Sequence, residues 1–451
     1  MANVPHANPV VAPATGGGWP YQLDNGLARL LVDCHMIAFH DRQSGAAMRD
    51  YQFKCIAHLL GHARKHSSWW RERLTALDSG SPINLIDLPL MGRADFRASL
   101  QAAGGALPVP PSHGQVSSAS TSGSSGIPLT FHSTGLVARL NQAQYWQDRI
   151  RQGVDSSRTI ARFSVHLADH DGEHVTGRPN PVLAMGVELQ RRAQQFTIEQ
   201  HARWISEVAP AYIISHPTVL VGVMEVFEDG KIAPPRLEAL LTYAESLPPD
   251  FRVRARQIFG AKTLDRYSSQ EVGPIAFQCP SSDEHYHVAG SHVLVEVLDE
   301  NGKPMPSGQL GRVYVTSLHN FAGPILRYEL GDLAALLPRC PCGHGQPTLT
   351  NILGRERFLI QLPSGERVYV NFGARHWLKI APVMEHRLVQ TEPLVVEAEY
   401  VMDRAMTPQE EQALLSLLRH EISPEIAYVV KRLDAIPWGP SYKRQDVVSL
   451  V

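Results

Sequence analysis

The sequence predicts an α/β fold, on three observations. In the middle of the chain, short apolar runs such as Tyr212–Ile214 alternate with helix-like segments at Pro235–Ala244 and Asp250–Phe259, which is typical of a partly parallel sheet. The 451 residues exceed the roughly 100–200 residues of one domain, so we expect at least two domains. A content of 43% hydrophobic and 19% charged residues excludes a disordered or fibrous chain.

The segments before and after this alternation suggest where the domains begin and end. Residues 1–44, which start with a stretch rich in Pro, Ala and Gly, are predicted to be a flexible arm and lead-in. Apolar residues at helical spacing predict helices over Asp50–Leu77 and Thr134–Arg151. We therefore expect a large α/β domain over residues 45–353.

A different pattern occupies the last third of the chain. Two strand-like runs, Val293–Leu298 and Arg312–Thr316, flank the turn signal Asn301–Gly302 and predict an antiparallel β element appended to the α/β domain. Residues 354–451 have their own strand signal at Leu394–Val401 and an amphipathic helix at Pro408–Ile422. These residues are predicted to form a small α+β domain.

Charge and cysteine content restrict the classes of partner. Lys+Arg 42 against Asp+Glu 44 gives a net charge of -2, which provides no general attraction for nucleic acid or an anionic membrane. No uninterrupted apolar run reaches the roughly 18–20 residues of a membrane span, and the N-terminus does not resemble a secretory signal. Five scattered cysteines do not suggest a disulfide framework, so we expect a cytoplasmic protein.

The most distinctive local sequence is the Ser/Gly-rich segment 117–128. Small residues let backbone N–H groups approach an anion closely, and the hydroxyls add donors, so the segment suits a polyphosphate. Composition alone also fits a flexible linker, but the segment lies between elements predicted to belong to the main core. It lacks the lysine of the Walker nucleotide-binding loop.

The order T-S-G-S-S-G-x-P at 121–128 resembles the phosphate-binding loop of adenylate-forming enzymes. Four further elements of that superfamily follow in order, namely Y-S-S-Q-E at 267–271, R-Y-E-L-G-D at 327–332, Gly354–Arg355, and Pro437 followed by Lys443. The sequence L-P-L-M at 88–91 and C-P-C-G at 340–343 are similar to the phenylacetate–coenzyme A ligase branch. We identify the chain as a member of this superfamily from residue 45 onward.

The resemblance implies a reaction and a set of site residues. It implies an ATP-dependent ligase that converts an aryl or arylacetic acid to acyl-AMP with release of pyrophosphate, then transfers the acyl group to coenzyme A. Glu271 would hold Mg²⁺, which prefers carboxylate and phosphate oxygens, and Lys443 would stabilise charge during adenylation from a C-terminal domain that rotates about a hinge at Arg357. The implied ATP-binding residues are Thr121, Ser122, Gly123, Ser124, Ser125, Gly126, Ala244, Glu245, Ser246, Tyr267, Ser268, Arg327, Asp332 and Arg355.

Departures from the pattern leave alternatives open. Gln270 replaces a hydroxyl residue, Ala244–Ser246 replaces a G-G-E element, and residues 362–369 differ from the family's turn beside the thiol tunnel. The acceptor could therefore be a carrier-protein thiol or an amine instead of coenzyme A. A non-catalytic nucleotide- or zinc-binding protein is a third possibility, and a homodimer is left open.

Four residues suggest a structural zinc site. Cys340 and Cys342 form a C-x-C pair on a Pro/Gly-rich turn, which presents two thiolates to one ion, and Cys279 and His287 would complete a tetrahedral Zn²⁺ site. Related ligases in the resembled branch have a similar set. The alternative is that Cys279 is a small core residue and the C-x-C pair lies on an ordinary loop.

Overall fold

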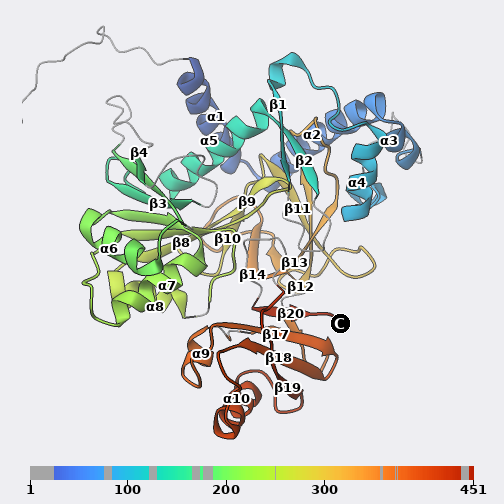
Figure 1. Cartoon of the computed structure of the whole chain (residues 1–451). Coiled ribbons are helices and arrows are strands. Elements are labelled where there is room, and N and C mark those ends of the chain that lie inside the picture. The colour runs from blue at the N-terminus through green and yellow to red at the C-terminus, as the bar shows by residue number, and fades with distance from the viewer. Residues whose placement is uncertain are drawn as a thin grey trace, which may run out of the picture.

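The computed structural model confirms the α/β class (Figure 1). The structure describes residues 25–75, 84–120, 129–164, 173–175, 186–193, 195–248, 250–355, 359–370, 372, 374–437 and 446–451. Within them, one sheet of 12 strands has the order β11-β12-β13-β14-β10-β9-β8-β7-β6-β3-β5-β4. This sheet joins a mainly parallel half to an antiparallel half, and strand β8 lies where the two halves meet.

The parallel half contains the alternating pattern seen in the sequence. Its strands are β3 (Ile160–Ser164), β5 (Glu188–Arg192), β6 (Tyr212–Ser215), β7 (Ala239–Tyr243) and β8 (Lys262–Ser269), with the short β4 (Glu173–Val175) antiparallel at the edge. Its helices are α5 (Gly135–Arg151), α6 (Ile198–Val208), α7 (Pro217–Glu228) and α8 (Phe251–Phe259).

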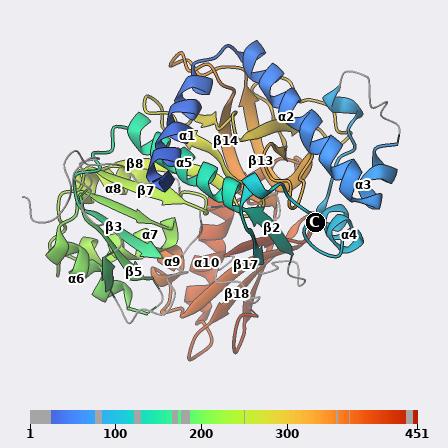
Figure 2. The same ribbon diagram turned by 90° about the horizontal axis from the view of Figure 1, so that it is seen from above.

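The two faces of this half pack against different helices. Alternate residues along a strand point to opposite faces, so Ile213 and Leu240 join the core formed with α6, α7 and α8, whereas Ile214, Leu241 and Leu264 face the other way. Figure 2 shows α5 crossing this second face. The helix predicted over Pro235–Ala244 is wrong, because its apolar run is a buried parallel strand, for which continuous hydrophobicity is typical.

The antiparallel half includes the predicted β element. Strand β9 (Gly273–Gln278) pairs with β8 and with β10 (Tyr286–Val288), and β10 pairs with β14 (Thr348–Arg355). Strands β11 (Val293–Leu298), β12 (Leu310–Ser317) and β13 (Tyr328–Leu337) complete it. The connection between β11 and β12 contains Asn301–Gly302, where Gly302 has φ +73°, so the predicted antiparallel pairing around this turn is confirmed.

Helices near the N-terminus cover the sheet. Helix α1 (Asn25–Asp41) packs Leu30, Cys34 and Ile37 with Ala143 of α5, so the flexible arm predicted for residues 1–44 is wrong for this part. Ser67 divides the predicted single helix into α2 (Gly45–His66) and α3 (Ser68–Arg73), because its side chain caps α3. Helix α4 (Arg93–Ala102) and the hairpin β1 (Val116–Ser120) and β2 (Thr130–Thr134) follow.

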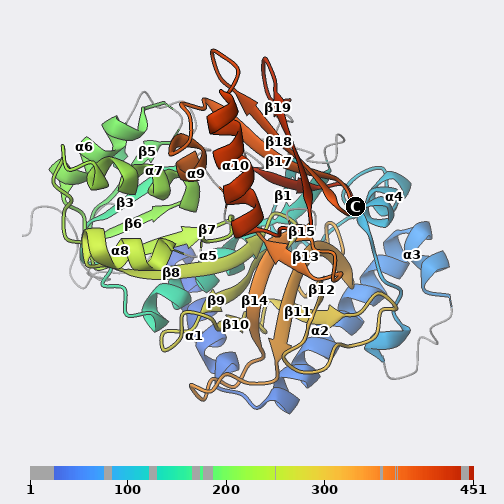
Figure 3. The ribbon, with the colours of Figure 1, turned by 90° about the horizontal axis from the view of Figure 1, so that it is seen from below.

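The C-terminal elements have a hydrophobic core of their own. A sheet of order β19-β18-β17-β20 is formed by β17 (Glu385–Glu392), β18 (Val395–Val401), β19 (Ala427–Arg432) and β20 (Val447–Ser449). Together with α9 (Ala374–Leu378), α10 (Pro408–Glu421) and the hairpin β15 (Leu359–Gln361) and β16 (Arg367–Tyr369), it lies on one side of the large sheet (Figure 3). Within the described residues, no helix is both long and apolar enough to cross a membrane.

Candidate nucleotide site, Cys/His cluster and polar cavity

Tyr267 and Asp332 are 65 residues apart in sequence and are joined by a hydrogen bond. The Tyr267 hydroxyl on β8 donates to Asp332 Oδ2 on β13 at 2.5 Å. Asp332 is buried, and its backbone pairs with that of Arg355 across β13 and β14. A buried carboxylate beside an aromatic ring can accept hydrogen bonds from a ribose while the ring lies against a base.

The segment Ala244–Ser246 follows β7 and reaches the same region. Ala244 has φ +68°, an uncommon conformation for a residue with a Cβ, and it turns the chain sharply at the end of the strand. Gly354, with φ +75°, lies so close to Ser246 that a Cβ there would be 2.6 Å from Ser246 Oγ. Since Gly354 is paired with Leu333, next to Asp332, the 244–246 segment lies near the Asp332 strand.

Glu245 has a local structural partner. Its carboxylate accepts a hydrogen bond from the backbone N–H of Thr218 at 3.0 Å and another from the Thr218 hydroxyl. Thr218 lies in the first turn of α7, where unpaired N–H groups favour a negative charge. This contact fixes the 244–246 segment to the parallel half of the sheet.

Glu271 lies in the turn between β8 and β9 and is buried at 7% exposure. Ser268 lies at the end of β8, after a register irregularity between Tyr267 and Ser268. Gly273, with φ +81°, begins β9 against Asn141 of α5, where a Cβ would approach the Asn141 amide to 2.7 Å. The turn that carries Glu271 is therefore closely packed.

Arg327 is placed differently from its expected contact with ATP. Its guanidinium forms two hydrogen bonds with Glu296, at 2.9 and 3.0 Å, and donates to the Leu88 carbonyl at 2.8 Å. Its side chain is only 3% exposed. The predicted phosphate or hinge contact for Arg327 is therefore corrected to a buried structural ion pair that connects β13, β11 and the segment before α4.

Several expected site residues lie outside the described part of the chain. They are the loop residues Thr121, Ser122, Gly123, Ser124, Ser125 and Gly126, the hinge residue Arg357, and Lys443. Strands β1 and β2 flank the loop segment. For Arg355 only the backbone is described, in β14 beside Asp332. The roles of these residues remain predictions.

The four predicted metal ligands form a cluster. The possible ligand atoms of Cys279, His287, Cys340 and Cys342 all lie within 4.8 Å of one another. Cys342 Sγ is 3.3 Å from His287 Nε2, and Cys340 Sγ is 3.7 Å from Cys279 Sγ. Tetrahedral Zn²⁺ with its usual bond lengths holds its ligand atoms roughly 3.4–3.8 Å apart, so the donor set fits this ion.

The surroundings of the cluster also suit a metal ligand. The His344 ring stacks on that of His287 with centroids 4.0 Å apart. Burial, followed by the neighbouring His344, lowers the pKa of His287 to about 3, so the imidazole is neutral near pH 7. A neutral imidazole is the form that binds metals.

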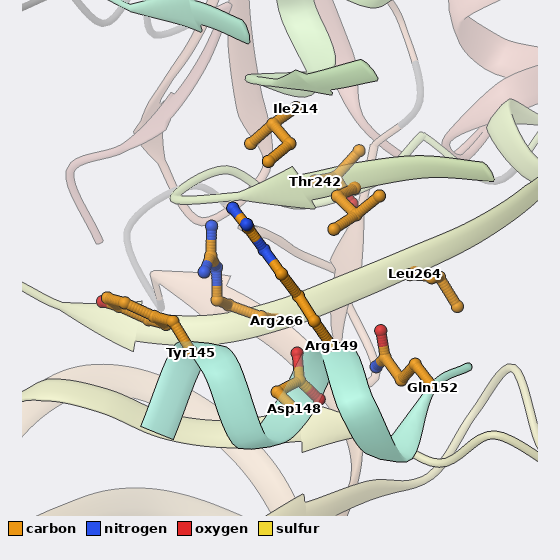
Figure 4. Close-up of a pocket in the computed structure, with 9 residues that line it drawn as sticks. Tyr145, Asp148, Arg149, Gln152, Ile214, Thr242, Leu264 and Arg266 are labelled. Atoms are coloured by element: carbon orange, nitrogen blue, oxygen red, sulfur yellow. The ribbon is translucent and has the colours of Figure 1, made fainter. Parts of the chain in front are cut away.

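A polar cavity between α5 and the sheet was not found from the sequence (Figure 4). Its lining includes Tyr145, Asp148 and Arg149 of α5, and Arg266 of β8. These residues form no recognised motif. Arg266 follows the buried residues Thr263, Leu264 and Asp265 of β8 and directly precedes Tyr267.

Comparisons with known proteins agree with the fold. No protein-family model matches the chain. It is 28% identical over 260 residues to a phenylacetate–coenzyme A ligase of Thermus thermophilus, covering 56% of this chain and 57% of the relative. It is 24% identical over 315 residues to a phenylacetate–coenzyme A ligase of Pseudomonas putida, covering 65% and 67%. The match thus spans little more than half of the Thermus relative.

Solved structures resemble nearly the whole chain. A 2-hydroxyisobutyryl-CoA ligase in the postadenylation state, in complex with R3-HIB-AMP, gives a TM-score of 0.67 with 18% identity and 91% coverage of both chains. The same ligase in the thioesterification state, with 2-HIB-AMP and CoA, gives a TM-score of 0.57 with 17% identity. These likenesses show the fold, and the sequence matches confirm the resemblance to the phenylacetate–coenzyme A ligase branch.

Proposed function

Because the chain is a homologue of phenylacetate–coenzyme A ligases with the fold of the adenylate-forming superfamily, we propose that it is an ATP-dependent carboxylic acid ligase. The proposed reaction joins the acid to the α-phosphate of ATP, releases pyrophosphate, and then transfers the acyl group to the thiol of coenzyme A. Such chemistry depends mainly on positioning and on neutralising charge. The curated relatives carry this activity in their names.

One observation carries the proposal, namely the 2.5 Å hydrogen bond from Tyr267 to Asp332. It joins two of the superfamily motifs in space, and Ser246 contacts Gly354 of a further segment. In this arrangement Asp332 would accept hydrogen bonds from the ribose hydroxyls, and Glu271 would hold Mg²⁺ with the ATP phosphates. The loop 121–126 and Lys443 would act on the phosphates and on the developing acyl-adenylate.

The test is pyrophosphate release across a panel of carboxylic acids, with and without coenzyme A. We expect release that depends on an acid, and formation of an acyl thioester when coenzyme A is present. Adenylation without thioester formation would instead favour a carrier-protein thiol or an amine as acceptor. A protein that binds ATP but activates no acid of the panel would contradict the proposed function.

The Cys/His cluster supports a structural Zn²⁺ at the end of β9 and β10. Three of its four residues are buried, so a bound ion would connect β10 to the turn before β14 without exposure to substrate. We expect about one zinc per chain in protein purified without chelator. Cys340→Ser with Cys342→Ser should remove the metal and lower the melting temperature.

The matched control for this pair is Cys55→Ser, which changes a cysteine outside the cluster. That control should keep the metal. Metal analysis that finds no zinc in the unmodified protein would contradict the zinc proposal without affecting the proposed ligase reaction.

A further inference from the structure

The polar cavity lies on the face of the parallel strands that α5 covers (Figure 4). Ile214, Leu241 and Leu264 are register neighbours in β6, β7 and β8 and form an apolar row across its wall. Two residues further along, Tyr243 and Arg266 are again register neighbours on the same face. The wall therefore changes from apolar to polar toward the ends of the strands.

Arginines from three different elements meet around this cavity. Arg149 of α5 and Arg266 of β8 line it, and Arg162 of β3 lies beside Ile214. Glu188 pairs with Arg162 at 2.6 Å and lies 3.8 Å from Arg149. One firmly ionised carboxylate thus serves two of the three guanidinium groups.

Arg266 is held by aromatic rings instead of by a carboxylate. Its guanidinium lies 4.4 Å from the ring centroid of Tyr145 and 5.1 Å from that of Tyr243. Within the part of the chain that the structure describes, no carboxylate lies within 4.0 Å of it. Stacking on a ring leaves the N–H donors at the edge of a guanidinium available for a planar acceptor.

Asp148 does not supply the missing negative charge. Its carboxyl lines the cavity and forms no hydrogen bond or ion pair with the described residues. Burial raises the pKa of Asp148 to about 7, although Arg151, Arg266 and Arg149 lower it, so this group is only partly ionised near neutral pH. Burial, together with the nearby Arg162 and Arg266, lowers the pKa of Arg149 to about 10, although Glu188 acts in the opposite direction. The cavity is therefore positively charged.

The cavity adjoins the candidate nucleotide site along the chain. Tyr243 is followed by Ala244, and Arg266 is followed by Tyr267, whose hydroxyl reaches Asp332. A small acid whose reacting carboxylate lies at the ends of these strands would therefore extend its other end toward Arg266 and Arg149. In the structure these two long side chains extend into the cavity and occupy much of it, so an acid would enter only after they adopt other rotamers.

We propose that the acid activated by this protein carries a second carboxylate, which Arg266 and Arg149 bind at the end opposite the reacting group. This inference rests on the proposed ligase function and specifies its substrate class. A planar carboxylate can take two parallel hydrogen bonds from a guanidinium, and it would neutralise the charge that the described residues leave uncompensated. A plain hydrocarbon tail would leave Arg266 with no carboxylate within 4.0 Å among the described residues, and Arg149 with only the carboxylate of Glu188, which it shares with Arg162.

The experiment compares acids that differ only at the distal end. Pyrophosphate release is measured with phenylacetate, 4-carboxyphenylacetate and 4-carbamoylphenylacetate, and with the aliphatic pair hexanoate and adipate. We expect kcat/KM to be roughly 10- to 100-fold higher for at least one diacid than for the matching acid with an uncharged distal end. This is the size of effect that hydrogen bonds to a charged group produce. The carbamoyl group has nearly the shape of a carboxylate but no charge, so comparison with 4-carbamoylphenylacetate shows whether the charge or the shape of the distal group is recognised.

Two variants then assign the preference to the cavity. Arg266→Leu and Arg149→Leu should each remove most of the preference for the diacid, measured as the ratio of kcat/KM for the diacid to kcat/KM for the acid without a second carboxylate. Arg203→Leu is the matched control, because this arginine is exposed on α6 and pairs with Glu199 outside the cavity. Thermal unfolding checks that each variant is folded, and Arg266→Gln replaces any leucine variant that is not.

The outcomes separate the inference from the proposed function. Two results would overturn the inference and leave the ligase function standing. One is that the unmodified protein prefers acids without a second carboxylate, and the other is a diacid preference that survives both cavity variants. Activation of no acid in the panel would overturn the ligase function and the inference with it. Because the first comparison uses the unmodified protein, it remains decisive even if no variant folds.

Discussion

Two arginines, Arg266 in strand β8 and Arg327 directly before β13, show how differently one residue type can be used. Arg327 is 3% exposed, makes two hydrogen bonds to Glu296 and donates to the Leu88 carbonyl. Arg266 contacts the rings of Tyr145 and Tyr243 and lies near the Arg149 guanidinium. Arg327 pairs with a carboxylate, whereas Arg266 has aromatic partners and, among the described residues, no carboxylate within 4.0 Å.

This difference reverses the expectation from sequence. Arg327 belongs to a recognised motif and was predicted to contact ATP, whereas Arg266 belongs to no motif. A motif residue can be retained by a fold for its internal contacts, and a residue outside every motif can be the one available for a ligand. If partners within the fold mark a structural residue and a lack of them marks a functional one, substitutions of Arg327 and Arg266 should have different effects.

The largest effect on stability is expected for Arg327→Met. Glu296 would keep a buried negative charge without its partner, and breaking a buried ion pair destabilises a protein by about 3–5 kcal/mol. Denaturant unfolding measures this loss. The double change Arg327→Met with Glu296→Leu should recover much of it, because both charges are then absent. A single variant as stable as the unmodified protein would contradict a structural role.

Unlike Arg327→Met, Lys443→Ala is expected to slow adenylation without lowering the free energy of unfolding. Loss of one preorganised charge-stabilising group slows a reaction by about 10²–10³-fold. Pyrophosphate release measures the first half-reaction, and conversion of supplied acyl-AMP measures the second, which should proceed at a near-normal rate. Equal impairment of both halves would indicate that Lys443 only supports the C-terminal fold.

Much of the fold could be predicted from sequence because local signals agreed with the tertiary environment. The turn at Asn301–Gly302 gives the β11–β12 pairing, and the periodicity at Pro408–Ile422 gives α10. The Pro235–Ala244 segment was misassigned because a short apolar run is consistent with either a buried strand or a helix. Helix α1 was missed because its contact with α5 is a tertiary one.

Of the candidate sites too, one could be predicted from the sequence and others could not. Cys279, His287, Cys340 and Cys342 could be grouped in advance because few side chains bind a soft metal. The partner of Arg327 could not be predicted, because Glu296 lies on another strand with no spacing rule relating the two. The cavity around Arg266 depends on the register of β7 and β8 and on the rotation of α5, which no local pattern specifies.

Asp332→Ala tests a buried carboxylate that accepts a hydrogen bond from Tyr267 and is expected to bind ATP as well. Hydrogen bonds to a charged acceptor contribute about 1.5–3 kcal/mol each, so we expect KM for ATP to rise roughly 10- to 100-fold. Steady-state pyrophosphate release at varied ATP measures it. Tyr267→Phe is the control, because it removes the 2.5 Å hydrogen bond and keeps the carboxylate. An unchanged KM for ATP in folded Asp332→Ala would remove this residue from the site.

The smallest effect on stability is expected for Arg266→Leu. The variant loses the contacts with the rings of Tyr145 and Tyr243, each worth about 0.5–1 kcal/mol when partly exposed. It also removes a positive charge that repels Arg149, which acts in the opposite direction. We therefore expect the free energy of unfolding to change by less than about 1 kcal/mol. If Arg266→Leu lowered the free energy of unfolding as much as Arg327→Met does, Arg266 would have a structural role as well. The contacts within the fold would then not distinguish the two arginines.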